Sequence, residues 1–236
     1  ADVPAGTGMG SSGSFTVGLL HALKAYKLET ILTEDLAKTA NHIEMNILGE
    51  PCGKQDHYIA AYGGLTCQEY HPDGTVTITP LKVSQATLKD MSENLMLFFT
   101  GYSRAAAEIL VDQKDKSEKG DPGMLDNLHF IKDLGLRIKD KLEGGDVRGF
   151  AELMNEHWEH KKARSRNISN DHVNGLYDLA MRNGALGGKL VGAGSGGFLL
   201  FHASDKPQLR DAMTGEGLHE MDFAFDFDGS IVLLRQ

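Results

Sequence analysis

The sequence has few cysteines and no long apolar segment. Cys52 and Cys67 are its two cysteines, and no segment resembles the apolar core of a secretory leader. We therefore expect reduced thiols in a cytoplasmic protein rather than a disulfide. The longest apolar stretches, residues 95–99 and 197–201, are far shorter than the ~20 residues that a membrane-spanning helix needs. These absences predict a soluble protein with no membrane partner.

Positive charge is also scarce. The chain has 24 Lys and Arg against 33 Asp and Glu, which gives a formal net charge of -9. Nucleic acids bind mainly to basic surfaces that neutralise their phosphates, so we expect no nucleic-acid partner. Hydrophobic residues make up 41% of the 236 residues, which is enough to form the core of one large domain or two small ones.

Glycine, by contrast, is abundant. The 28 glycines amount to about 12% of the chain (28/236), against a usual ~7%. Eight of them lie in two short clusters, residues 6–13 and 192–197. Because glycine has no side chain, such clusters indicate close approach of the backbone to a ligand or to another part of the backbone.

The first cluster leads into a predicted helix. Residues 4–12 are typical of a loop, and apolar residues follow at helical spacing from Phe15 to Tyr26, with Ser11 or Ser12 as the expected N-cap. A glycine loop at a helix N-terminus offers several backbone N–H groups and the positive end of the helix dipole to a phosphate. A tight turn packed in the core is the alternative interpretation.

Other glycine motifs fit less well. Residues 8–13 and 192–197 both have the G-x-G-x-x-G spacing of a dinucleotide-binding loop. Pro4 makes the segment before the first a poor central strand, and an apolar strand rather than a helix follows the second. No glycine-rich loop ends in the Gly-Lys-Ser or Gly-Lys-Thr of a Walker A motif.

The hydrophobic pattern predicts an α+β protein with two domains that join near residue 81. The charged run 112–121 is expected to be an exposed loop. The predicted helices cover residues 34–47, 56–62, 84–93, 103–114, 124–143, 146–163, 170–184 and 205–213. The predicted strands cover residues 65–70, 75–79, 95–100, 189–192, 197–202, 218–227 and 230–234.

Three motifs in order along the chain resemble those of the GHMP kinases, the family of galactokinase and of homoserine, mevalonate and phosphomevalonate kinases. The loop from Pro4 to Ser12 is similar to the nucleotide loop of the family. Glu44 and the run 51–56 (PCGKQD) resemble the galactokinase pattern at the same separation, and the run 189–198 (KLVGAGSGGF) resembles the third family motif. Within the family, the similarity to heptose 7-phosphate kinases shows in residues 53–64, 99–104 and 187–190.

The resemblance implies the GHMP kinase fold, of the α+β class. Residues 1–81 would be the remainder of a ribosomal-S5-like N-terminal domain, incomplete here, and residues 82–236 a ferredoxin-like C-terminal domain. The family's first motif, which precedes the glycine loop, is missing, and the chain begins Ala-Asp-Val-Pro without a methionine. We therefore expect that residues 1–236 alone lack activity.

The resemblance also implies roles for particular residues. ATP would be the phosphoryl donor, Ser12 and Glu44 would hold Mg²⁺, and Asp56 would orient or deprotonate the acceptor hydroxyl. Taken alone, Glu44 is equally typical of a solvated helix residue and Asp56 of a helix N-terminal carboxylate. The implied nucleotide-binding residues are Pro4, Gly6, Thr7, Gly8, Met9, Gly10, Ser11 and Ser12. Candidate substrate contacts are Arg104, Gly64 and Gly194.

The implied function is a cytoplasmic kinase that uses ATP and Mg²⁺ to phosphorylate the anomeric hydroxyl of a small-molecule sugar phosphate. D-glycero-D-manno-heptose 7-phosphate, giving the 1,7-bisphosphate, is the first choice of substrate. A kinase for another sugar, fucose- or galactose-like, and a non-catalytic relative that binds a nucleotide or sugar are the alternatives. The ten histidines show no spacing typical of a zinc site. The oligomeric state stays open, with a homodimer as one alternative.

Overall fold

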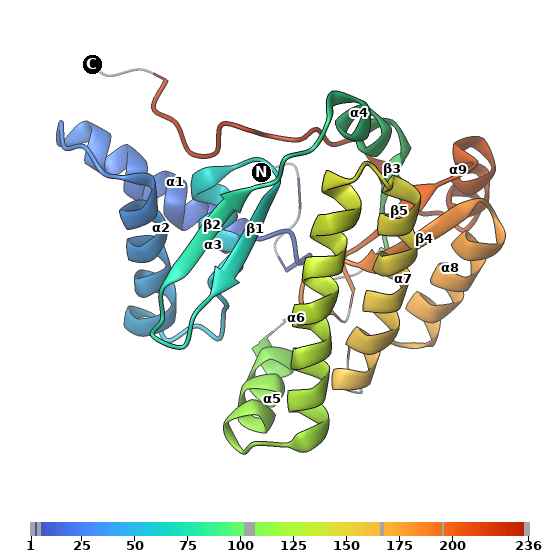
Figure 1. Cartoon of the computed structure of the whole chain (residues 1–236), viewed down its shortest axis with the longest axis horizontal. Helices are drawn as coiled ribbons and strands as arrows, with labels where there is room; N and C mark the ends of the chain where they lie inside the picture. The colour runs from blue at the N-terminus through green and yellow to red at the C-terminus, as the bar shows by residue number, and fades with distance from the viewer. Residues whose placement is uncertain (1–2, 4–5, 102–106, 166–167, 195, 234–236) are drawn as a thin grey trace. The chain divides into compact units, whose positions relative to one another are not determined.

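The computed structural model describes residues 3, 6–101, 107–165, 168–194 and 196–233 (Figure 1). It combines helices with antiparallel sheets, so the predicted α+β class is confirmed. The chain forms two compact units: a small unit of residues 10–81 and 225–236, and a large unit of residues 1–9 and 82–224. Among the described residues, no helix combines the length and the apolar character that a membrane crossing requires.

The small unit packs helices and a hairpin around an apolar core. α1 and α2 both contact α3, and Val17, Leu36 and Tyr58 are buried between them. Glu34 and Asp35 lie in the first turn of α2, where their negative charges interact favourably with the positive end of the helix dipole. The elements are α1 (Ser11–Tyr26), α2 (Thr33–His42), the π-helical segment η1 (Ile43–Ile47), α3 (Gln55–Tyr62), β1 (Thr66–Tyr70) and β2 (Val76–Pro80).

α1 has an exposed apolar face. The helix itself was predicted, but of its apolar residues the structure buries Val17, while Phe15 is 69% exposed and Tyr26 is 87% exposed. Leu19 and Leu23 lie on the same face and are also exposed. A contiguous apolar surface of this kind is typical of a face that contacts other protein.

The end of the chain joins the small unit and does not form the predicted strands. The Cβ of a side chain at Gly229 would lie 2.4 Å from the Ala61 carbonyl oxygen, and the Gly64 N–H donates to the Asp226 carbonyl at 2.6 Å. Asp226 and Gly229 therefore contact Gly64 and Ala61 instead of pairing with a strand. The predicted strand 218–227 is therefore reduced to His219–Met221, and residues 230–233 form no strand.

The large unit is built on a sheet of strand order β4-β5-β3-β6 in which neighbouring strands are antiparallel. Leu97 at the centre of β3 lies opposite Leu200 of β5 on one side and Met221 of β6 on the other. β4 begins before the predicted strand 189–192 and has an irregular register between Ala185 and Gly187. The strands are β3 (Leu95–Phe99), β4 (Ala185–Leu190), β5 (Phe198–Ala203) and β6 (His219–Met221).

Helices cover this sheet and enclose its core. α7 and α8 pack against β4, and α9 packs against α8 and β6. Trp158, Phe98 and Phe201 are fully buried members of the core, which agrees with the long apolar runs of the two central strands. The helices are α4 (Gln85–Asn94), α5 (Ala107–Glu118), α6 (Pro122–Glu143), α7 (Val147–Arg164), α8 (Asp171–Arg182) and α9 (Lys206–Gly215).

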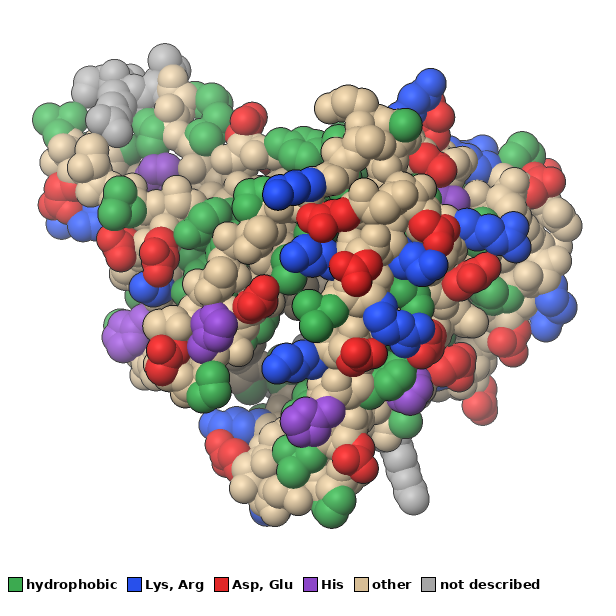
Figure 2. Space-filling model, in the orientation of Figure 1, with side chains coloured by type: hydrophobic (Ala, Val, Ile, Leu, Met, Phe, Trp, Pro, Cys, Tyr) green, Lys and Arg blue, Asp and Glu red, His purple; other side chains and the backbone are tan. Residues whose placement is uncertain are grey.

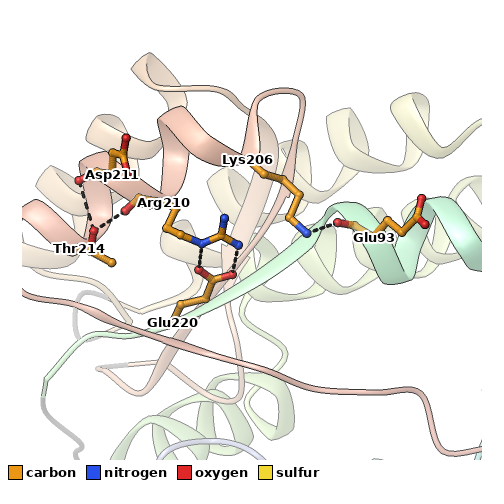
Figure 3. Close-up of polar contacts among 6 residues, drawn as sticks. All are labelled: Glu93, Lys206, Arg210, Asp211, Thr214 and Glu220. Atoms are coloured by element: carbon orange, nitrogen blue, oxygen red, sulfur yellow. Dashed lines mark hydrogen bonds and ion pairs between the residues drawn. The ribbon is translucent and has the colours of Figure 1, made fainter.

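Polar contacts on the surface of the large unit add little to this core. Arg210 of α9 donates two hydrogen bonds of 2.5 and 2.9 Å to Glu220 of β6 (Figure 3). Basic and acidic side chains are interspersed over α6 and α7 (Figure 2), where Arg137 donates to Glu156 at 3.0 and 2.9 Å. Exposed pairs of this kind contribute little to stability because solvent screens them, so the apolar core provides most of the stability.

The prediction of a loop over residues 112–121 is wrong. α5 continues through this run to Glu118. Lys116 pairs with Asp112 at 2.7 Å, and Lys114 pairs with Glu118 at 3.8 Å, each one helical turn apart. The alternating charges that suggested a solvated loop therefore support an exposed helix through i,i+4 pairs.

The compact units differ at both chain ends from the predicted domains 1–81 and 82–236. The change of unit between Leu81 and Lys82 falls at the predicted position, whereas residues 1–9 pack with the large unit and residues 225–236 with the small one. The physical reason is backbone contact: Gly192 and Gly197 lie directly against Gly8 and Thr7. The assignment of the two segments as family domains stays a prediction.

We predict that Gly187→Ala in β4 lowers the free energy of unfolding by about 1–3 kcal/mol, the usual cost of overpacking. The added Cβ would lie 1.9 Å from the Ala151 carbonyl oxygen of α7, so strand and helix must separate. Gly175→Ala in α8 is the control, because its Cβ meets nothing within 4 Å and alanine is favoured in a helix by roughly 0.5–1 kcal/mol. Denaturant unfolding measures both, and equal effects would contradict the packing argument.

Candidate functional site

The N-terminus of α1 has no side-chain cap among the described residues, so the predicted serine cap is wrong. Gly10 precedes the helix in the left-handed region, with a φ of 67°. The first bond of the helix runs from the Ser14 N–H to the Gly10 carbonyl at 2.9 Å. The N–H groups of Ser11, Ser12 and Gly13 lie before it and carry the positive end of the dipole.

Two hydroxyls of α1 converge on one buried carboxylate. Ser12 Oγ donates to Glu44 Oε2 at 3.3 Å, and Thr16 Oγ1 donates to Glu44 Oε1 at 2.6 Å. Ser12 and Thr16 are one helical turn apart, so both face the same way. The Glu44 side chain is 5% exposed, and these bonds compensate the cost of burying a carboxylate. The structure thus brings together the two predicted metal ligands, and adds Thr16.

The carboxylate of Glu44 also contacts a buried histidine. His57 Nε2 lies 3.2 Å from Glu44 Oε2, and the His57 side chain is 1% exposed. The other ring nitrogen, Nδ1, lies 3.3 Å from Asn41 Nδ2, which also donates to the Gly53 carbonyl at 3.4 Å. His57 follows Asp56 in the sequence, but nothing in the sequence indicated that His57 contacts Glu44.

Cys52 completes a cluster that the sequence did not indicate. Ligand atoms of Glu44, Cys52 and His57 all lie within 4.8 Å of one another. Burial and the negative charge of Glu44 raise the pKa of the Cys52 thiol to about 11, so the thiol is protonated at neutral pH. Both cysteines are free, as expected. The only hint in the sequence was that Cys52 and His57 lie five residues apart. That spacing is not a recognised metal-binding motif.

Asp56 lies against the beginning of α1. A Cβ at Gly10 would be 3.2 Å from Asp56 Cγ, and a Cβ at Gly13 would be 3.0 Å from Asp56 Cβ. The absence of side chains at these glycines lets the carboxylate approach the helix N-terminus. Asp56 has solvent-accessible surface, yet the protein around it raises its pKa, mainly through desolvation and secondarily through Glu44, while His57 acts in the opposite direction.

The second glycine cluster supports the start of the first within the large unit. A Cβ at Gly192 would be 2.5 Å from Gly8 Cα, and one at Gly197 would be 2.1 Å from the Thr7 carbonyl oxygen. Lys161 is buried and donates to the Leu190 carbonyl at 3.0 Å and to the Gly192 carbonyl. Gly192 and Gly197 are needed so that this segment can lie against the backbone of Gly8 and Thr7. This packing accounts for the spacing that resembles a dinucleotide-binding loop.

The other predicted residues fall in several places. Gly6 has a φ of 76° in the same loop as Gly8, and Met9 is 37% exposed. Gly64 in the small unit contacts the Phe227 side chain, and Gly194 in the large unit packs against Ile168. Pro4 and Arg104 lie outside the described residues. The geometry therefore gives a site in the small unit formed by Ser12, Glu44 and Asp56, with Thr16, His57 and Cys52 added.

The donor atoms of Ser12, Thr16 and Glu44 are all oxygens. Hard divalent cations such as Mg²⁺ prefer oxygen ligands and retain several waters, so one carboxylate with a neighbouring hydroxyl suits them. The residues present therefore fit Mg²⁺, with the Glu44 carboxylate as the charged ligand and Ser12 Oγ beside it.

Comparison with known proteins places this site in a family context. Residues 1–64 match the family described as GHMP kinases N terminal domain, and residues 138–219 match GHMP kinases C terminal. A D-glycero-alpha-D-manno-heptose 7-phosphate kinase of Campylobacter jejuni is 32% identical over 231 residues, which are 97% of this chain and 68% of that protein. A galactokinase of Pyrococcus furiosus is 27% identical over 227 residues, with coverage of 83% and 60%.

Solved structures agree with these relatives. A D-glycero-D-manno-heptose 1-phosphate kinase from Bacteriodes thetaiotaomicron aligns with a TM-score of 0.75 and 28% identity, covering 97% of this chain and 64% of that one. A galactokinase of Lactococcus lactis aligns with a TM-score of 0.75 at 15% identity, over 99% and 69%, and this similarity concerns the fold alone. The chain thus spans about two thirds of the length of these relatives.

We predict that Asp56→Asn stabilises the protein at neutral pH. The raised pKa means that the folded state holds this proton more tightly than the unfolded chain, so wild-type stability falls as pH rises from the unfolded pKa through the folded pKa. Asparagine does not titrate, so the gain in melting temperature should grow over that window and then level off.

Thermal unfolding of both proteins from acid to neutral pH measures this gain. Asp35→Asn, in the first turn of α2, is the matched control, because it removes an exposed helix-dipole carboxylate and should lower stability by about 0.3–1 kcal/mol. A neutral-pH loss of stability in Asp56→Asn as large as that in the control would contradict the desolvation argument.

Proposed function

The chain belongs to the GHMP kinase family and has its α+β fold, and from this premise we propose that the protein transfers the γ-phosphoryl group of ATP to a hydroxyl of a sugar phosphate. The observation that carries the proposal is the convergence of Ser12, Glu44 and Asp56 at the N-terminus of α1. An anion site, an oxygen donor set for a hard cation and a carboxylate together meet the needs of phosphoryl transfer.

The N-terminus of α1 would bind the terminal phosphates of ATP. Its N–H groups and dipole compensate negative charge without a basic side chain, which is consistent with a unit whose site contains no lysine or arginine among the residues named above. Mg²⁺, held by Glu44 and Ser12, supplies further charge neutralisation on the phosphate oxygens when bound. The remaining nucleotide-loop residues, Gly6 to Met9 and Pro4, stay predictions.

Asp56 is the proposed catalytic residue. Its carboxylate lies beside Gly10 and Gly13, next to the phosphate-binding end of α1, so a hydroxyl bound to it would face the terminal phosphate. Desolvation raises the pKa of Asp56, which makes it a better proton acceptor than an ordinary aspartate. It would orient the hydroxyl and accept its proton as the new P–O bond forms.

The proposed acceptor is the anomeric hydroxyl of D-glycero-D-manno-heptose 7-phosphate. Support comes from the name of the Campylobacter jejuni relative and from the motifs shared with that branch of the family. The structural relative from Bacteriodes thetaiotaomicron is described as a heptose 1-phosphate kinase, which would require a different free hydroxyl. Arg104, Gly64 and Gly194 remain candidate contacts for the sugar.

We predict that Asp56→Asn in the whole protein lowers kcat by about 10²–10⁴-fold, the usual contribution of a positioned general base. Binding of ATP, measured by calorimetry, should not weaken, because Asp56 is proposed to bind the acceptor hydroxyl, and its negative charge beside the α1 N-terminus does not attract phosphate. Asp35→Asn provides the control and should keep wild-type kcat. A loss of ATP affinity with a kcat near that of wild type would show that Asp56 serves the nucleotide instead.

We also predict the order of substrates in an assay of ADP release. Heptose 7-phosphate should be used with a kcat/KM roughly 10- to 100-fold above that of unphosphorylated heptose, as expected for loss of a charge-assisted contact. Heptose 1-phosphate, fucose and galactose complete the panel. Preference for an unphosphorylated sugar would contradict the proposed substrate and identify that sugar as the acceptor. ATP binding without turnover of any substrate would favour a non-catalytic relative.

A further inference from the structure

The small unit holds a cluster of three chemically different metal-ligating side chains. Glu44 comes from η1, Cys52 from the turn that follows, and His57 from α3, and their ligand atoms lie within 4.8 Å of one another. The backbone fixes this turn, since the Glu50 N–H donates to the Glu44 carbonyl at 2.9 Å and the Cys52 N–H donates to the Glu50 carbonyl at 2.9 Å. Cys52 is therefore held beside Glu44 by the local fold.

His57 supplies an independent indication of a ligand. Its Nε2 atom is buried and, although 3.2 Å from Glu44 Oε2, has no partner of acceptable hydrogen-bond geometry among the described residues. Buried polar atoms almost always form a well-directed hydrogen bond, and this nitrogen forms none with its carboxylate neighbour. This nitrogen faces the carboxylate and belongs to the same cluster as the thiol.

The ligand types indicate the class of metal. Mg²⁺ prefers oxygen, whereas a set of one sulfur, one imidazole nitrogen and one carboxylate oxygen suits Zn²⁺ and similar cations. Bonds of about 2.0–2.3 Å to a tetrahedral ion would place the ligand atoms roughly 3–4 Å apart. The observed cluster needs only small side-chain movements to reach that spacing. Three protein ligands leave a fourth position for water.

We propose that Glu44, Cys52 and His57 form a binding site for a thiophilic divalent cation such as Zn²⁺. Glu44 would also belong to the proposed Mg²⁺ site, whereas Cys52 and His57 would not. On binding, the Cys52 thiol loses its proton to solvent. The His57 proton moves to Nδ1, and the Asn41 carboxamide rotates so that its oxygen, in place of Nδ2, faces that N–H. A metal-bound histidine usually donates its other ring N–H to an oxygen in this way.

The shared carboxylate has a consequence that rests on the proposed function. If Glu44 turned its oxygens toward the thiophilic cation, it would lose its bonds from Ser12 and Thr16, and with them its contact with the proposed Mg²⁺ ligand Ser12. Occupancy by the thiophilic cation therefore opposes Mg²⁺ binding, so the site would make the kinase sensitive to inhibition by zinc. The binding site itself does not depend on kinase activity.

The test is a titration of the whole protein with Co²⁺, without nucleotide or sugar, followed by absorption spectroscopy. Co²⁺ bound to a thiolate gives a near-ultraviolet charge-transfer band. Four-coordinate Co²⁺ also gives intense visible absorption bands. We expect one Co²⁺ per chain with both features, displaced by one equivalent of Zn²⁺. Cys52→Ser should lose the charge-transfer band, and His57→Gln should weaken binding. Cys67→Ser, at the second cysteine of the chain, is the matched control and should keep the band.

Thermal unfolding with and without Zn²⁺ guards against misfolded variants. Zn²⁺ should raise the melting temperature of wild type and Cys67→Ser, and leave that of Cys52→Ser and His57→Gln unchanged. Absence of the band in folded wild type, its persistence in Cys52→Ser, or its loss in Cys67→Ser would each overturn the proposal. Mg²⁺ with a non-hydrolysable ATP analogue should reduce the band; an unchanged band would overturn the sharing of Glu44. A kinase-inactive protein that still shows the band would separate the two proposals.

Discussion

The buried carboxylate of Glu44 is the interaction on which the site depends. A carboxylate in a residue that is 4% exposed needs neighbouring donors, and Ser12 and Thr16 provide them from two successive turns of α1. The same bonds fix the rotation of α1 about its axis. Because Gly10 and Gly13 then face α3, Asp56 can lie against the N-terminus of α1. One buried charge thus positions both halves of the site.

The π-helical segment explains how Glu44 reaches that position. α2 ends at His42, and the Leu48 N–H donates to the Ile43 carbonyl at 2.9 Å, an i to i+5 bond. Glu44 lies within this wider turn, and its carboxylate accepts hydrogen bonds from Ser12 and Thr16 of α1. Single π turns occur often at functional sites, and here the turn is the feature that an ordinary helix over 34–47 would lack.

The two glycine clusters serve different purposes. In the first, Gly10 supplies a left-handed residue before α1 and leaves room for Asp56. In the second, Gly192 and Gly197 allow backbone to lie on backbone at Gly8 and Thr7. Both were recognised as clusters in the sequence, yet the same G-x-G-x-x-G spacing resulted from two unrelated steric requirements. Spacing alone could not distinguish a ligand-binding loop from a packing contact.

The sequence by itself determined the α+β class, most helices and the hairpin, because these depend on local periodicity and on motifs that keep their order along the chain. The roles of Ser12, Glu44 and Asp56 stay predictions, although the structure does bring Ser12 and Glu44 into contact. The sequence mispredicted the run 112–121, where local charges suit a loop and a helix equally well. Only the tertiary structure decided that Thr16, Cys52 and His57 join Glu44, and that the end of the chain packs beside Ala61. Those contacts join residues far apart in sequence or depend on how a π turn directs one side chain, and neither is encoded in spacing along the chain.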